Sequence, residues 1–88
     1  MKNREQQILD EVLKEYKRAT IKHSPFNSCH EGWAVIKEEF DELWDEVKKR
    51  REVRSQDKMI KEAIQGAAMY LRFLMELTGF KLDNIKEK

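Results

Sequence analysis

Residues 28–51 read SCHEGWAVIKEEFDELWDEVKKRR, and this stretch decides the fold. It begins with a capping box, in which the Ser28 hydroxyl can accept the Glu31 N–H and the Glu31 carboxylate can reach back to the Ser28 N–H. Apolar residues then recur every three or four positions, the spacing of one helix face. They are Trp33, Ile36, Phe40, Leu43, Trp44 and Val47. The closing cations favour the negative end of a helix, so the stretch predicts one helix over residues 29–52.

Two further helices are predicted, over residues 3–20 and 57–78. Each carries apolar residues at helical spacing. The stripes are Ile8, Leu9, Val12, Leu13, Tyr16 and Ala19 in the first, and Ile60, Ala63, Ile64, Ala67, Tyr70, Leu71, Leu74 and Leu77 in the last. Gly79 stands where a glycine commonly ends a helix, so we expect the last helix to stop there.

The connections between these helices are predicted from proline and from polar residues. Pro25 disfavours helix at the residue before it, so residues 22–28 predict a loop. The polar residues 53–57 predict a second break. We expect the tail after Phe80 to be frayed.

Length and composition restrict the class of protein. Eighty-eight residues allow one domain, spanning residues 1–88. Charged residues make up 40% of the chain and glycine and proline are scarce, which indicates an all-α protein. The single cysteine excludes an internal disulfide framework, and no apolar run is long enough to span a membrane. A net charge of +1 gives no field that attracts nucleic acid. We therefore expect a soluble cytoplasmic protein that binds neither membranes nor nucleic acid.

The last helix predicts a partner subunit. Besides its main stripe it places Gly66, Met69 and Phe73 together on a second side. A helix that is apolar on two sides is normally covered on both, and a chain this small buries only a thin core. We expect a bundle of three main helices that is completed as a four-helix-type bundle by oligomerisation through the second and third helices.

Carboxylates on the second helix suggest a metal site. Glu39 and Glu42 are three residues apart and stand on the same side of the helix, with Glu39 at the margin of the apolar stripe. Neighbouring carboxylates repel, and a hard divalent cation such as Mg²⁺ or Mn²⁺ removes that repulsion. The alternative is an ordinary solvated acidic face.

Glu62 on the third helix is the matching candidate. It lies on the side of Gly66 and Met69, where a carboxylate costs several kcal/mol unless it is paired or bound to metal. The alternative is that Glu62, near the helix N-terminus, pairs with Lys58 or Lys61.

Other residues carry less chemistry. Trp33 and Trp44 could stack on a nucleobase, but their place on the apolar stripe predicts core positions. His23, Cys29 and His30 lack the spacing of a zinc site. The cations near residues 48–54 could contact phosphates or simply solvate a helix end.

The two acidic motifs together resemble a known family. Glu38-Glu39-Phe40-Asp41-Glu42 resembles the EExxE signature of the MazG-like, all-α nucleoside triphosphate pyrophosphohydrolases. In that family an ExxD motif follows on the next helix, and Glu62-Ala63-Ile64-Gln65 stands in its place. The flanks at residues 30–36 and 67–69 resemble short, often phage-borne members. The resemblance covers roughly residues 5–78.

This resemblance implies a fold and a reaction. Members pack two central helices against those of a second subunit, as dimers or pairs of dimers. Mg²⁺ (or Mn²⁺) held by the motif carboxylates binds the triphosphate, and water cleaves between the α and β phosphorus atoms to give a monophosphate and pyrophosphate. By position, Glu39, Glu42, Glu62 and Gln65 would be the metal ligands, and Glu38 an auxiliary carboxylate. The implied partners are a (d)NTP substrate and further copies of the chain, in a homodimer or homotetramer.

Gln65 departs from the family signature, which has aspartate there. An amide oxygen still ligates weakly, but it brings no negative charge and cannot act as a base. Two functions therefore remain open. One is the pyrophosphohydrolase, and the other is a catalytically weakened relative that binds a nucleotide or metal or acts as a helical protein-interaction module.

Overall fold

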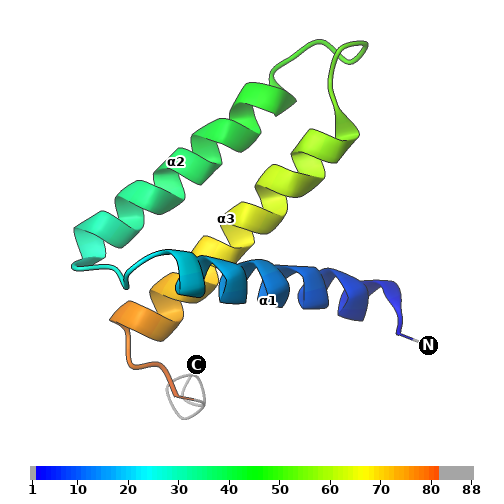
Figure 1. Cartoon of the computed structure of the whole chain (residues 1–88). Helices are drawn as coiled ribbons and strands as arrows, with labels where there is room; N and C mark the ends of the chain where they lie inside the picture. Colours follow the sequence, from blue (N-terminus) through cyan, green and yellow to red (C-terminus); the bar gives the residue numbers. More distant parts are fainter. Residues whose placement is uncertain (1, 82–88) are drawn as a thin grey trace, which may run out of the picture.

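A computed structural model describes residues 2–81 and contains three helices and no strand within that range. The helices are α1 (Arg4–Lys22), α2 (Cys29–Val47) and α3 (Gln56–Leu77). Figure 1 shows α2 and α3 as an antiparallel hairpin, with α1 crossing α3. The predicted all-α class is confirmed. No helix in the described range is long and apolar enough to cross a membrane.

The helix starts follow from side-chain caps. Asn3, Ser28 and Ser55 each accept the backbone N–H three residues further on, at 2.8, 3.1 and 3.1 Å. The predicted capping box at Ser28 is only half formed. The Glu31 carboxylate accepts the Asn27 backbone N–H at 2.7 Å instead of the Ser28 N–H.

The helix ends differ more from the prediction. Gly79 has φ of +59°, as expected of a glycine after a helix C-terminus. By contrast, α2 ends at Val47, well before residue 52. The Glu46 carboxylate accepts the Ser55 backbone N–H at 2.6 Å and the Lys49 ammonium at 2.9 Å, which ties the connection back onto the end of α2. The cationic run therefore forms the turn between α2 and α3 rather than a last turn of helix. The predicted frayed tail lies almost entirely outside the described residues.

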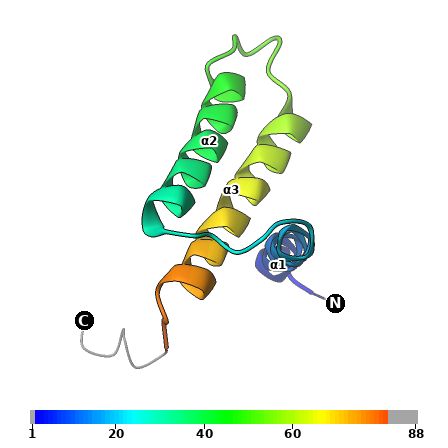
Figure 2. The same ribbon diagram turned by 60° about the vertical axis from the view of Figure 1, so that its left-hand side comes forward.

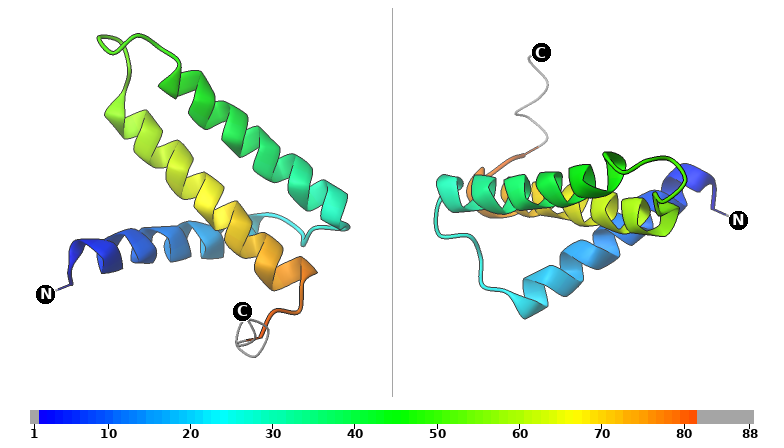
Figure 3. Two further views of the ribbon diagram at one scale, coloured as in Figure 1. Left: turned by 180° about the vertical axis from the view of Figure 1, so that it is seen from behind. Right: turned by 90° about the horizontal axis from the view of Figure 1, so that it is seen from above.

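The third helix is central to the arrangement. Seen along α1, α3 lies between α2 on one side and α1 on the other (Figure 2). α1 packs against α3, and its backbone does not come close to that of α2. Seen from above, α1 runs obliquely along one side of the α2–α3 hairpin (Figure 3). Residues of α1, α2 and α3 together line a cleft between α1 and α2.

A small core forms where the three helices and the first connection meet. Its buried apolar residues are Ala19, Phe26, Ala68 and Met69. Arg72 is also buried; it donates to the Glu76 carboxylate at 2.9 Å and to the Ser24 carbonyl at 3.0 Å. Its guanidinium lies 4.1 Å from the centre of the Phe26 ring. Arg72 thus fixes the connection between α1 and α2 against α3.

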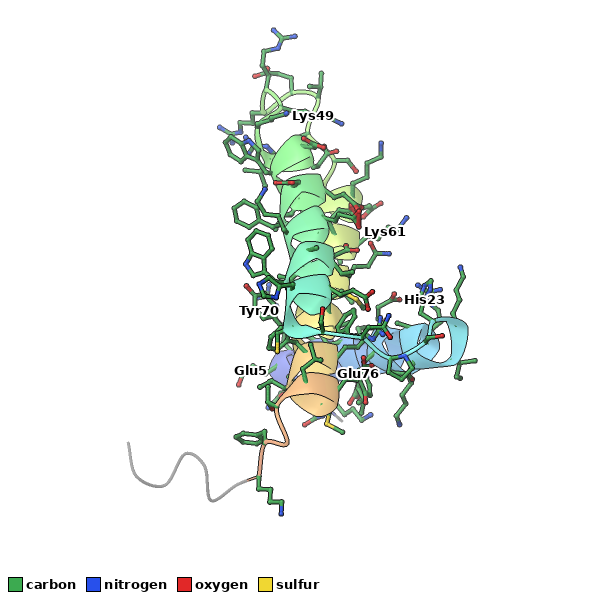
Figure 4. The ribbon with its side chains drawn as sticks, turned by 90° about the vertical axis from the view of Figure 1, so that its left-hand side faces the viewer. Glu5, His23, Lys49, Lys61, Tyr70 and Glu76 are labelled. Atoms are coloured by element: carbon green, nitrogen blue, oxygen red, sulfur yellow. The ribbon has the colours of Figure 1, made fainter. Side chains whose placement is uncertain are left out.

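The aromatic residues of the predicted core face of α2 are exposed in the single chain, whereas Ile36, Leu43 and Val47 on the same face are half-buried. Phe40, Trp33 and Trp44 are 65%, 62% and 54% exposed, so the core positions predicted for both tryptophans are wrong for the monomer. The reason is that α1 packs on the side of the α2–α3 hairpin opposite to these aromatic residues and so does not cover them. In Figure 4 Tyr70 points to the side away from His23, where α1 ends.

Candidate metal centre

Three carboxylates from α2 and α3 converge on one point. Glu39, Glu42 and Glu62 each offer an oxygen, and these oxygens lie within 4.8 Å of one another. Glu39 and Glu42 share a side of α2 because they are three residues apart. The two helices lie side by side here: a Cβ on Gly66 would be in ordinary van der Waals contact with the Glu39 Cβ, 3.9 Å away. The convergence predicted for these residues is therefore present.

Glu39 is the least satisfied member of the cluster. Its side chain is half-buried, and one oxygen, Oε2, is fully buried without a hydrogen-bond partner among the described residues. An unpaired buried polar atom costs about 1–3 kcal/mol, and more when it is charged. Such an atom calls for a cation or a proton.

The electrostatics point the same way. Burial raises the pKa of Glu39 from 4.5 to about 7, and repulsion from Glu42, Glu62 and Glu38 adds to the shift. Burial likewise raises the pKa of Glu42, with further contributions from a hydrogen bond to Glu62 and from its charge. Both pKa shifts arise from burial, to which the neighbouring carboxylates add.

The donor set fits a hard divalent cation. All three groups are carboxylates, and Mg²⁺ is commonly held by a few such oxygens while water or substrate phosphate completes its shell. The alternative prediction for Glu62 is not realised. Neither Lys58 nor Lys61 forms an ion pair with it in the described part of the chain, although both lie nearby along a shallow pocket.

Glu38 does not join the three converging carboxylates. It is exposed and lines a cleft on the α1 side of Glu39. Gln65 is half-buried and lines the same cleft beside Glu39. Glu38 and Gln65, the residue that stands where the family signature has aspartate, therefore both line the cleft between α1 and α2.

The other acidic residues of α2 are occupied elsewhere. Asp41 pairs with Lys37 at 2.8 Å and Asp45 with Lys48 at 3.1 Å. Glu46 is buried and holds the connection to α3. None of the three replaces the charge absent at Gln65.

The cleft brings together residues that the sequence pattern did not connect with the carboxylate cluster. It has a volume of about 430 Å³ and is walled by α1, the first connection, α2 and α3. From α1 come Glu15, Arg18 and Ala19, and His23 follows directly. No spacing rule could have placed these residues in one cleft, because periodicity shows which face of α1 is apolar but not that α1 crosses α3 at this point.

Comparison with known proteins adds no relative: no protein-family model, no curated protein and no solved structure matches the chain.

Proposed function

We propose that the protein is a Mg²⁺-dependent nucleoside triphosphate pyrophosphohydrolase of the MazG-like type, converting a (d)NTP and water to a (d)NMP and pyrophosphate. The observation that carries the proposal is the convergence of Glu39, Glu42 and Glu62 around a buried carboxylate oxygen with no partner. The order of the two acidic motifs along the chain supports it independently.

The position of each residue suggests its role in the reaction. Glu39, Glu42 and Glu62 would hold the cation, which supplies charge neutralisation for the triphosphate and polarises the attacking water. Glu38 makes no ion pair within residues 2–81 and is free to accept a proton from that water. Lys58 and Lys61, beside Glu62, offer positive charge for the departing pyrophosphate.

The exposed aromatic face of the α2–α3 hairpin, which contains Trp33, Phe40 and Tyr70, supports a homodimer or homotetramer. Monomeric proteins rarely expose large clustered apolar side chains, yet Trp33, Phe40 and Tyr70 are 62%, 65% and 62% exposed and line one apolar pocket of α2 and α3. A second copy packed on α2 and α3 would complete a four-helix bundle and cover Trp33, Phe40 and Tyr70.

Pyrophosphate release from a panel of NTPs and dNTPs, with Mg²⁺, with Mn²⁺ and with a chelator, tests the proposal. We expect equal amounts of monophosphate and pyrophosphate, dependent on the metal. Glu62→Gln should lower kcat/KM at least about 100-fold, because it removes a ligand worth several kcal/mol in the transition state. Asp41→Asn, in the same acidic segment but paired with Lys37, is the matched control and should keep its activity.

Unchanged turnover in a folded Glu62→Gln variant would rule out this site. Gln65 favours the second candidate, the weakened relative, because the cluster holds one charge fewer than the family signature. Release of no pyrophosphate from any nucleotide, combined with a gain of activity in Gln65→Asp, would establish that candidate.

A further inference from the structure

The cleft beside the carboxylate cluster is rich in acceptors and has its cations already paired. Glu15, Glu31 and Glu38 contribute carboxylates to its walls, besides Glu39. Arg18 is held by Glu15 at 2.6 Å, and Arg72 by Glu76 at 2.9 Å. The cleft therefore carries net negative charge and suits the uncharged part of a substrate better than its phosphates.

The cleft and the carboxylate cluster are contiguous. Glu39 belongs to both, and Gln65 lies beside it on the floor. Glu31 lines the far end, eight residues before Glu39 and therefore ~12 Å away along the helix axis. The volume of about 430 Å³ falls within the usual range for small-molecule sites. A substrate whose phosphates lie at the carboxylates would extend its nucleoside into this space.

We infer that the cleft between α1 and α2 binds the nucleoside of the substrate and selects cytosine and adenine over uracil and hypoxanthine by their exocyclic amino group. This inference rests on the proposed function. The amino groups of cytosine and adenine are donors, whereas uracil and hypoxanthine present a carbonyl acceptor at the same position. An ionised carboxylate only accepts, so it binds the amino group and repels the carbonyl.

Two carboxylates of the cleft walls, Glu15 and Glu31, retain capacity for such a donor. Glu15 receives two bonds from Arg18, and Glu31 receives two from Asn27. Each ionised carboxylate has about four lone-pair sites, so both keep unused acceptor positions. His23 and Gln65 make no hydrogen bond within the described range through their side chains, and they remain available for the ring nitrogens and the sugar.

Nucleosides without phosphate test the inference apart from hydrolysis. The protein, labelled with ¹³C in its methionine methyl groups, is titrated without Mg²⁺ with cytidine against uridine and with adenosine against inosine. Met69 is buried and lines the cleft, whereas Met75 is exposed on α3 outside it. We expect Met69 to shift and saturate at least about tenfold earlier with the amino-bearing member of each pair, the effect of one good hydrogen bond to a charged group. The Met75 signal should stay in place.

A blocked variant controls for the location. Val35→Phe adds bulk to the cleft wall and should abolish the Met69 shift, whereas Ala34→Phe, exposed and outside the cleft, should preserve it. If Val35→Phe does not fold, the wild-type comparison of the nucleoside pairs still decides. No shift of Met69 with any nucleoside, or equal affinity within each pair, would overturn the inference.

The two proposals fail separately. Pyrophosphate release without nucleoside binding in the cleft would remove this inference and leave the proposed function standing. Selective nucleoside binding without pyrophosphate release would remove the proposed hydrolase activity and leave the nucleoside-binding cleft standing.

Discussion

At the scale of single residues, Glu39 is the position where folding places a carboxylate in an unfavourable environment. Its carboxylate is half-buried, lacks a positive partner and stands beside two like charges. Folding alone gains nothing from this arrangement, since neutral or apolar side chains at the helix contact would avoid the repulsion. Local destabilisation of this kind is characteristic of binding sites, where a ligand supplies the missing charge.

The raised pKa of Glu39 predicts how the stability of the metal-free protein depends on pH. The folded chain keeps the proton up to about pH 7, whereas the unfolded chain releases it near 4.5. Between these values the folded state binds more protons, so its contribution to stability is present below pH 4.5 and is lost as the pH rises to about 7. Solvent screening of this half-exposed group leaves about 1 kcal/mol of the effect.

Thermal unfolding with a chelator present checks this prediction. The Tm at pH 7.5 should lie about 4–8 °C below the Tm at pH 5. Glu39→Gln should remove most of the difference, because it cannot ionise, and Asp41→Asn should leave it. An equal pH dependence in the wild type and Glu39→Gln would contradict the assignment of strain to Glu39.

At the scale of elements, helix starts were predictable and helix ends less so. The Ser28 and Ser55 caps depend on residues three positions away, which a sequence displays directly. The early end of α2 depends on Glu46 reaching the Ser55 backbone across the turn, a contact that exists only once the hairpin has formed. Charge pattern alone favoured a longer helix, and the tertiary contact prevailed.

Two helical glycines should respond oppositely to alanine. A Cβ on Gly32 would lie 2.7 Å from the Leu77 Cδ1 and 2.9 Å from the Phe73 Cδ2, where α2 meets the end of α3. Gly32→Ala should therefore destabilise the protein by about 1–3 kcal/mol, as overpacking does. At Gly66 the nearest atom is 3.9 Å away, so Gly66→Ala should add about 0.5–1 kcal/mol through helix propensity.

Urea denaturation of both glycine variants measures these changes. The midpoints should move in opposite directions with similar m-values. A Gly32→Ala protein as stable as the wild type would show that α2 and α3 are not packed closely at this end.

At the scale of the whole molecule, the candidate site was more predictable than its surroundings. Glu39, Glu42 and Glu62 converge as their helical positions indicated. Helical periodicity also identified the apolar face of α2, but not whether this chain itself covers that face. The path of α1, and with it the cleft, was beyond the pattern because it depends on how Phe26 and Arg72 pack together.

The exposed face predicts self-association. Tyr70 lies exposed on this face and lines the same pocket as Trp33 and Phe40. Sedimentation velocity should show a dimer or tetramer of the wild type, and Tyr70→Glu should shift it to monomer because a buried unpaired charge is costly. Ile21→Glu is the control. Ile21 is 88% exposed near the C-terminal end of α1, outside this face, and its replacement should not alter the assembly. A wild type that sediments as a stable monomer would contradict the prediction.

The central claim is that three carboxylates form one divalent-cation site, and calorimetric titration with Mg²⁺ at pH 7 tests it most directly. Running it in two buffers of different ionisation enthalpy also counts the protons released. We predict saturable binding with release of a fraction of a proton, because Glu39 is partly protonated at this pH. Glu39→Gln should lose both the binding and the proton release, and Asp41→Asn should retain them. No saturable binding by the folded wild type, or undiminished binding by Glu39→Gln, would contradict the account.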